Sequence, residues 1–264
     1  MSEPVVLCDV DARGVATVAI NRPNVNNAYN GAVIDALLNG AQTLGADPKV
    51  RVIVLRGKGR HFQAGADLKW INEISARSDT DNLAVSKNTT DAVRFLDLCP
   101  KPTIALVHGA CVGGGTGIAA ACDIVIASED AFFSIAEVRW GLHAGPILPQ
   151  LAAAMGTRNL RRYAITGERF DARTAQALGL VHEVCATGEL NAAAAPVIDS
   201  ILKNGPHAIA DTKKIIFHTS NLAIDDDLAL ELARDHARKR RTDEAAEGLR
   251  SFKEKRDAQW YLGS

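Results

Sequence analysis

The sequence predicts an α/β fold with a largely buried sheet, followed by a helical C-terminal module. Short β-branched runs alternate with segments of helical periodicity in the first two-thirds of the chain, and beyond about Pro146 the pattern is almost wholly helical. With 264 residues, 47% of them hydrophobic, the chain can bury one sizeable core. We therefore predict an α/β core over residues 1–200 and a helical module over residues 201–264.

The predicted elements follow one another closely. Strand patterns occupy residues 5–10, 15–20, 50–55, 103–107 and 124–127, and the first two predict a hairpin around Arg13-Gly14. Apolar residues at helical spacing occupy residues 30–45, 82–98 and 115–122, and the second of these helices stops before Pro100. The core is therefore expected to repeat strands and helices in a regular rhythm.

Bulk composition narrows the classes of function. The formal net charge is −1 and the isoelectric point about 6.7, so charge gives no support for nucleic-acid or membrane binding. No apolar run approaches the roughly 20 residues of a membrane span, and no secretory signal is visible, so we expect a cytoplasmic protein. The five cysteines and seven histidines show no CxxC or HExxH spacing, so we expect free thiols and no metal.

Two glycine-containing loops are candidate ligand sites. Within residues 61–69, the small residues Ala64-Gly65-Ala66 would let a ligand approach the backbone closely. The alternative is an ordinary tight turn into a helix, with Asp67 near the N-cap. Within residues 107–117, Gly113-Gly114-Gly115 ends a loop and opens a helix, where free N–H groups favour a negative oxygen. Close packing of that helix against a sheet would also require glycine.

Glu137 is the candidate acid or base. It lies in an otherwise apolar stretch, where loss of solvent would raise its pKa toward the range that suits proton transfer. It could equally be a solvated loop residue or the ion-pair partner of Arg139. Three other polar residues carry less weight: His108 and His143 fit structural roles, and Ser134 lacks the GxSxG context of a nucleophile.

Taken together, these motifs resemble the enoyl-CoA hydratase/isomerase (crotonase) superfamily from end to end. The matching strings are Asn21-Arg22-Pro23, residues 62–69, residues 101–109, Gly113–Gly117 leading to Ala121-Cys122-Asp123, Thr166-Gly167-Glu168, residues 177–181 and residues 251–256. The resemblance implies a spiral of repeated ββα units. It also implies C-terminal helices that form homotrimers, often paired as hexamers, and a bent acyl-CoA substrate with no separate cofactor.

The resemblance also assigns roles by position. It implies that the backbone N–H groups of Ala66 and Gly114 form an oxyanion hole for the thioester. Ala64 and the segment Ala66, Asp67, Leu68 and Lys69 fall where the family contacts the coenzyme A moiety. Two such donors would stabilise a thioester enolate, the intermediate shared by hydration, isomerisation and decarboxylation.

The chain departs from the usual hydratases at one catalytic position. Those enzymes carry two glutamates, and this chain keeps Glu137 but has Gly117 at the position of the other. Glu137 alone could activate water for attack at Cβ and return a proton to Cα, or it could move a proton between Cα and Cγ in a Δ3/Δ2 isomerisation. A third hypothesis is that the chain is a member of the family that binds acyl-CoA but is catalytically weak.

One string favours hydration and suggests a substrate. Residues 136–142, with Gly117 upstream, are similar to bacterial hydratases for 3-methylglutaconyl-CoA, in leucine breakdown, or isohexenylglutaconyl-CoA, in acyclic terpenoid breakdown. A substrate of this class carries a distal carboxylate and would need a cation or hydrogen-bond donors nearby. Arg139 and His143 are the candidates for that contact.

Overall fold

The core of the protein is a buried, mostly parallel sheet. The computed structural model describes residues 3–220, 222 and 225–263. Six strands lie in the order β1 (Val6–Val10), β2 (Val15–Ile20), β3 (Val52–Gly57), β5 (Thr103–Val107), β7 (Ile124–Ser128) and β10 (Glu183–Cys185). The hairpin of β1 and β2 is antiparallel, as the sequence predicts, and every other pair is parallel. Parallel strands are covered on both faces, which explains their continuous apolar runs.

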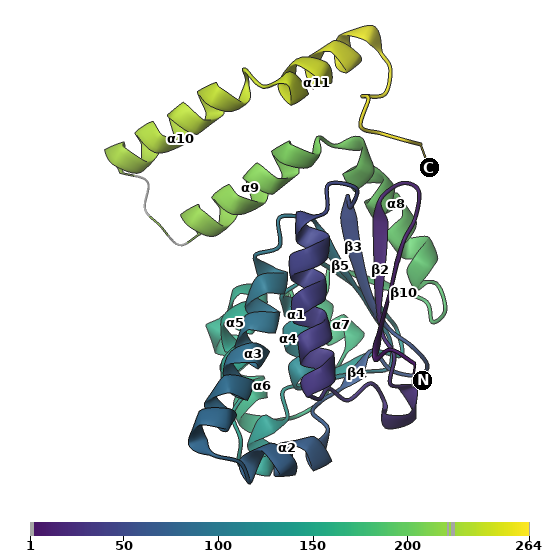
Figure 1. The fold of residues 1–264 in the computed structure, drawn as a ribbon, viewed down its shortest axis with the longest axis vertical. Helices are drawn as coiled ribbons and strands as arrows, with labels where there is room; N and C mark the ends of the chain where they lie inside the picture. Colours follow the sequence, from purple (N-terminus) through teal and green to yellow (C-terminus); the bar gives the residue numbers. More distant parts are fainter. Residues whose placement is uncertain (1–2, 221, 223–224, 264) are drawn as a thin grey trace.

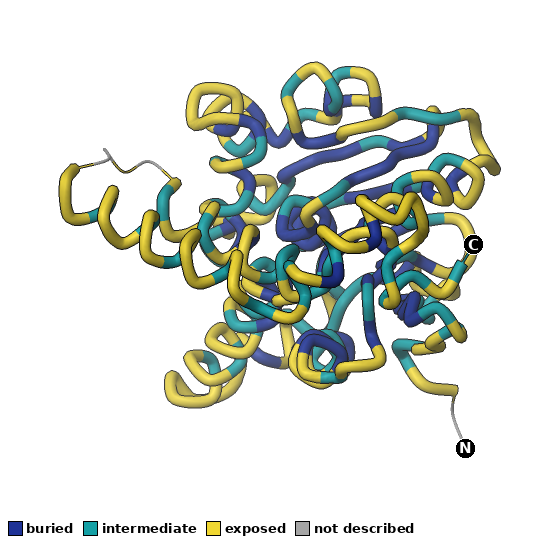
Figure 2. Tube along the Cα trace, turned by 90° about the horizontal axis from the view of Figure 1, so that it is seen from above, coloured by how far each residue is buried: buried dark blue, intermediate teal, exposed yellow. Residues whose placement is uncertain are grey.

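Alternate residues of these strands enter two separate apolar clusters. On one face, residues such as Ile53 and Leu55 pack with α1 (Gly31–Ala46) and α3 (Asp79–Asp97). On the other face, Val52 and Val54 pack with α8 (Leu190–Lys203). Figure 1 shows α1 and α8 on opposite sides of the sheet, and Figure 2 shows the buried strands among exposed helical turns. Because side chains alternate along a strand, one apolar run supplies both layers.

A second, smaller sheet positions the candidate loops. It contains β4 (Gln63–Ala64), β6 (Ala110–Val112), β8 (Phe132–Ser134) and β9 (Phe170–Asp171) in that order. The strands β4, β6 and β8 each follow a strand of the large sheet and run parallel to one another. This is the expected spiral of repeated units, in which two strands precede a helical segment. The segments that leave β4, β6 and β8 therefore meet at one edge.

The remaining helices of the core extend the same plan. They are α2 (Leu68–Ser75), α4 (Gly114–Ala120), α5 (Leu148–Met155), α6 (Thr157–Thr166) and α7 (Ala172–Ala177), with 3₁₀ turns η1 (Pro23–Val25), η2 (Glu137–Trp140) and η3 (Gly145–Ile147). The helix predicted over residues 82–98 begins earlier, because the Ser78 side chain caps it at the N–H of Asp81. The region beyond Pro146 is less purely helical than predicted, since β9 and β10 complete the two sheets.

The C-terminal helices lie apart from the sheet (Figure 1). They are α9 (Pro206–Thr219), α10 (Asp226–Lys239) and α11 (Asp243–Glu254). The Lys213 ammonium of α9 lies 2.8 Å from the Asp123 carboxylate of the core. Apolar side chains on this module remain uncovered: Phe252 is 85% exposed and Leu249 70%. The division near residue 200 and the homotrimer or hexamer remain predictions.

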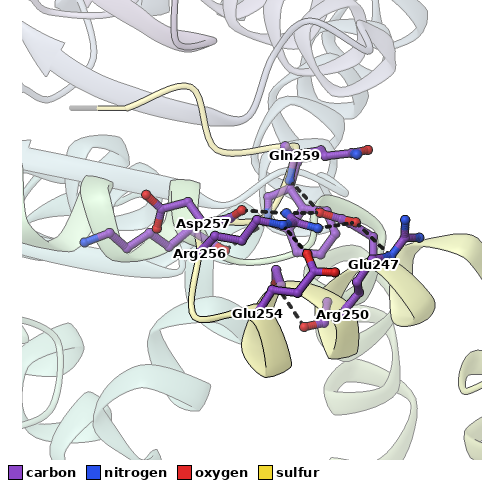
Figure 3. Close-up of polar contacts among 10 residues, drawn as sticks. Glu247, Arg250, Glu254, Arg256, Asp257 and Gln259 are labelled. Carbon is purple, nitrogen blue, oxygen red and sulfur yellow. Dashed lines mark hydrogen bonds and ion pairs between the residues drawn. The ribbon is translucent and has the colours of Figure 1, made fainter.

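A charged network fastens the end of the chain to α11 (Figure 3). The Glu247 carboxylate accepts two hydrogen bonds from the Arg256 guanidinium, at 2.7 and 3.1 Å, and one from the Gln259 N–H at 3.0 Å. These donors lower the pKa of Glu247 to about 2.

Among the described residues, no helix has the length and hydropathy needed to cross a bilayer.

Candidate active site

Two backbone loops meet where β4 and β6 end. In this parallel pair Gln63 lies opposite Cys111 and Ala64 opposite Val112. Both strands end there, and the residues that follow stay close: a Cβ on Gly113 would lie 3.7 Å from Cα of Gly65. Ala66 and Gly114 come directly after these two glycines, and both line the same cavity. The family resemblance assigned these two residues to one oxyanion hole; the fold places both on one cavity wall, and their role stays a prediction.

The N–H of Ala66 faces away from its neighbouring strand. Tyr29 forms a parallel bridge around Ala66: its N–H donates to the Gly65 carbonyl at 2.9 Å, and its own carbonyl accepts from the Asp67 N–H at 2.8 Å. In such a bridge the middle residue turns its own N–H to the opposite side. Among the described residues, none accepts a hydrogen bond from the Ala66 N–H. This donor is therefore available to a ligand.

Gln63 holds the loop in place and was not identified from the sequence. Its side chain is fully buried, its Oε1 accepts from the Gly65 N–H at 3.0 Å, and its Nε2 donates to the Gly65 carbonyl at 3.2 Å. Gly65 has a φ of 94°, a left-handed conformation that favours glycine. The loop is therefore rigid before any ligand arrives, which is what an oxyanion hole requires.

Gly114 supplies the other candidate donor. It is the first residue of α4, so its N–H has no acceptor within the helix. A Cβ at this position would lie 2.5 Å from Cε1 of Tyr29, so no larger residue fits without displacing that ring. The preceding residue, Gly113, has a φ of 56° and donates its N–H to the Ser134 carbonyl at 2.8 Å. That hydrogen bond links the ends of β6 and β8.

Glu137 begins η2, directly after β8. Its Oε1 lies 2.9 Å from where a Cβ on Gly113 would stand, so the carboxylate is beside the glycine loop. Its Oε2 is buried and has no hydrogen-bond partner among the described residues. Burial raises the pKa of this carboxyl group. An unpaired, desolvated carboxylate is suited to accept and return a proton.

Only some of the residues predicted to contact coenzyme A line the cavity. Ala64, Ala66 and Leu68 line the cavity, whereas neither Asp67 nor Lys69 is on its wall. Asp67 is the N-cap of α2: its carboxylate accepts from the N–H of Lys69 at 3.2 Å. It also pairs with Arg22 at 3.0 Å, and this hydrogen bond is the main cause of its lowered pKa. Its carboxylate is thus engaged in structure, and contacts to the cofactor moiety stay predictions.

A cavity of about 960 Å³ opens from these loops. It extends between α1 and α3, where apolar side chains such as Leu37, Leu44 and Leu96 form its wall. Among the described residues that line it, Glu137 is the only carboxylate. Its polar rim includes Arg139 and two further basic residues, His143 and Arg169. An apolar chamber with one carboxylate and two arginines suits a largely apolar ligand that carries an anionic group.

Ile147 fills the space beside Gly117. A Cβ at Gly117 would lie 2.1 Å from Cγ2 of Ile147 and 2.4 Å from its Cβ. These atoms are in the branched stem of the side chain and cannot move aside without a shift of η3. The position of the absent glutamate is therefore not a vacancy, and a carboxylate there would require a different η3.

Tyr29 is, like Gln63, a site residue that sequence reasoning missed. Its ring lies against Gly114 and meets Trp70 edge-on, with 5.9 Å between ring centroids. Burial, followed by the negative charge of Glu137, raises the pKa of the Tyr29 hydroxyl to about 12. Nothing marks this tyrosine in the sequence beyond its place shortly after Asn21-Arg22-Pro23. The phenol is therefore neutral at physiological pH.

The weaker candidates have structural partners. The Ser134 hydroxyl donates to the Gly167 carbonyl at 3.0 Å. A ring nitrogen of His108 lies 2.9 Å from the Gly59 carbonyl. His143 lines the cavity, and its Nδ1 accepts from the Gly145 N–H at 3.1 Å. Within the part of the chain that the structure describes, no group of three potential metal ligands lies together.

Known proteins resemble this chain over nearly its whole length. The family model for enoyl-CoA hydratase/isomerase matches residues 11–262. The peroxisomal Δ(3,5)-Δ(2,4)-dienoyl-CoA isomerase of Arabidopsis thaliana is 34% identical over 220 residues, 79% of each chain. The mevalonyl-coenzyme A hydratase of Aspergillus fumigatus is 31% identical over 250 residues, covering 93% of this chain and 91% of that protein.

A solved structure has the same fold. The crystal structure of an enoyl-CoA hydratase from Shewanella pealeana superposes with a TM-score of 0.93 at 35% identity, covering 97% of this chain and 96% of that one. The family match covers every strand except β1 and includes the C-terminal helices. The chain therefore belongs to the enoyl-CoA hydratase/isomerase (crotonase) superfamily of enzymes.

Proposed function

We propose that the protein hydrates a 2-enoyl-CoA thioester, with Glu137 as the only acid/base. The observation that carries this proposal is the placement of one buried, unpaired carboxylate beside two loops with free N–H groups. No other carboxylate among the described residues lines the cavity. Proton transfer must therefore pass through Glu137, while Ala66 and Gly114 hold the thioester oxygen.

The reaction follows from these positions. The thioester oxygen accepts hydrogen bonds from the N–H groups of Ala66 and Gly114. Glu137 removes a proton from water, the water oxygen bonds to Cβ, and the π electrons move onto the thioester oxygen as an enolate. The enolate then takes the proton from Glu137 at Cα, which restores the carboxylate. Loss of one oxyanion donor costs about 10²–10³-fold in comparable enzymes.

The proposed substrate is a 3-branched glutaconyl-CoA, such as 3-methylglutaconyl-CoA or isohexenylglutaconyl-CoA. Arg139 lines the cavity close to Glu137 in the chain and forms no ion pair with a described residue. Arg169 also lines the cavity, with its guanidinium 4.6 Å from the centroid of the Phe132 ring. An arginine without an ion-pair partner can donate two parallel hydrogen bonds to the distal carboxylate of a substrate. The apolar wall between α1 and α3 would then hold the 3-substituent.

Isomerisation is the second candidate. Glu137 stands alone in the cavity, and moving a proton between Cα and Cγ needs only one base. A dienoyl-CoA isomerase is also among the relatives. The discriminating measurement is mass spectrometry of products formed in ¹⁸O water. Hydration adds solvent oxygen to the acyl chain, whereas conversion of a 3-enoyl-CoA to a 2-enoyl-CoA adds none.

The first experiment combines this readout with Glu137→Gln. We expect kcat to fall by about 10²–10⁴-fold, while acyl-CoA binding persists because the oxyanion donors are backbone groups. Glu183→Gln, an exposed carboxylate on β10, is the matched control and should keep full activity. Undiminished turnover by Glu137→Gln would remove Glu137 as the acid/base. If the wild type binds both 2-enoyl-CoA and 3-enoyl-CoA substrates but converts neither, the hypothesis of a catalytically weak acyl-CoA-binding protein is favoured.

A second experiment addresses the distal carboxylate. Arg139→Gln should raise KM for a glutaconyl-CoA substrate and leave KM for the corresponding neutral crotonyl-CoA unchanged. Arg158→Gln, on the exposed surface of α6, serves as the control for loss of one positive charge. Equal changes in KM for the acidic and neutral substrates would contradict the proposed contact.

A further inference from the structure

Two consecutive glycines hold two different polar groups. The carboxylate of Glu137 lies against Gly113, with Oε1 2.9 Å from the position of a Cβ. The ring of Tyr29 lies against Gly114, with its Cζ 3.3 Å from the corresponding position. Both residues line the same cavity, so the phenol and the carboxylate face it from neighbouring points of one glycine loop. The negative charge of Glu137 contributes to the raised pKa of Tyr29, which agrees with this placement.

The Tyr29 hydroxyl has no assigned role in holding the fold. The Tyr29 backbone fixes the Ala66 loop, and its ring packs on Gly114 and Trp70. Among the described residues, no group exchanges a hydrogen bond with its hydroxyl. The residue lines the cavity. An unpartnered hydroxyl at a cavity wall is available to a ligand or to water.

We propose that the Tyr29 hydroxyl positions the attacking water together with Glu137. This inference rests on the proposed hydration. The water donates one O–H to the Glu137 carboxylate and the other to the Tyr29 oxygen, which leaves an oxygen lone pair directed at Cβ. Tyr29 thereby holds the water in place of a second carboxylate. That carboxylate is absent, and Ile147 fills the space beside Gly117 where it would stand.

Tyr29 does not exchange a proton in this step. The proton that leaves water goes to Glu137, the new bond joins the water oxygen to Cβ, and the same proton moves from Glu137 to Cα. The hydrogen that faces Tyr29 remains on the oxygen and becomes the product hydroxyl. Tyr29 is therefore a positioning residue, and its loss should affect water addition more than proton transfer at Cα.

The test compares Tyr29→Phe with Tyr163→Phe. Tyr163 is buried in α6 against Phe170, so its variant removes a hydroxyl outside the cavity. Each protein is assayed for hydration of a 2-enoyl-CoA and for deuterium exchange at Cα of the saturated acyl-CoA in D₂O. We expect Tyr29→Phe to lower kcat for hydration roughly tenfold, about the contribution of one hydrogen bond, with KM and Cα exchange within twofold of wild type. Tyr163→Phe should match the wild type in both assays.

The outcomes separate the two proposals. Full hydration by Tyr29→Phe overturns the role of Tyr29 and leaves the proposed function intact. Equal losses of hydration and Cα exchange also overturn it, because they would indicate a general disturbance of the site. No hydration of any 2-enoyl-CoA by the wild type overturns the proposed function, and the positioning role with it.

Discussion

Gly117→Ala tests whether Ile147 truly occupies the position of the second glutamate. The new methyl carbon would stand 2.1 Å from Cγ2 of Ile147 and 2.4 Å from its Cβ. Carbon atoms in contact are normally about 3.5–4.0 Å apart, so either η3 or α4 must move. Overpacking of this kind typically costs about 1–3 kcal/mol. The gain in helix propensity from glycine to alanine offsets up to about 1 kcal/mol. We expect a net loss of about 1–2 kcal/mol.

Gly40→Ala provides the matched control. Gly40 is also inside a helix, α1, but nothing lies within 4 Å of its Cβ position. Here only the helix propensity changes, so the free energy of unfolding should rise by about 0.5–1 kcal/mol. Urea unfolding followed by circular dichroism measures both variants, and opposite signs are expected. If Gly117→Ala is as stable as Gly40→Ala, Ile147 gives way at little cost and does not block the position.

A double variant isolates the contact. Ile147→Gly removes the atoms that the new methyl group would strike, at the cost of a cavity. If the clash is the cause, Ile147→Gly should destabilise the Gly117→Ala protein less than it destabilises the wild type. Strict additivity of the two effects would show that the residues do not interact.

Three further predictions follow from the site and the surface. Burial raises the pKa of Glu137 in the folded state above its value in the unfolded chain. The ionised carboxylate therefore destabilises the fold at neutral pH, and stability is regained as pH falls through the folded pKa. Glu137→Gln should therefore unfold at higher urea than wild type at pH 7, while wild-type hydration should decline as acid protonates this base. Gly117→Glu alone should not increase the hydration of crotonyl-CoA, whereas the double variant with Ile147→Gly should increase it. The absorbance of the enoyl thioester measures both rates, and a gain in the single variant would contradict the packing of Ile147 against Gly117. Phe252, 85% exposed, should be covered in a homotrimer, so Phe252→Glu should lower the mass measured by analytical ultracentrifugation, and a monomeric wild type would exclude this.

Local patterns predicted much of the fold. The β1–β2 hairpin, α1, the central strands and α4 are visible in periodicity and turn residues, because each depends on neighbours in the chain. The short strands β4, β6, β8, β9 and β10 were not predicted as strands. They have two or three residues each and are stabilised by pairing with distant segments, so local propensity carries little information about them. The spiral of repeated ββα units was predicted by the family resemblance, and its division into two sheets was not.

The sequence by itself determined the chemical parts of this protein: two glycine loops, one glutamate in an apolar stretch, and the absence of a carboxylate at Gly117. Only the tertiary structure decided how they work together. It brought Ala66 and Gly114 to one cavity wall, placed Glu137 and Tyr29 against two consecutive glycines, and closed the space at Gly117 with Ile147. These contacts join segments far apart in the chain. Their geometry depends on strand register and helix packing, which no local pattern specifies.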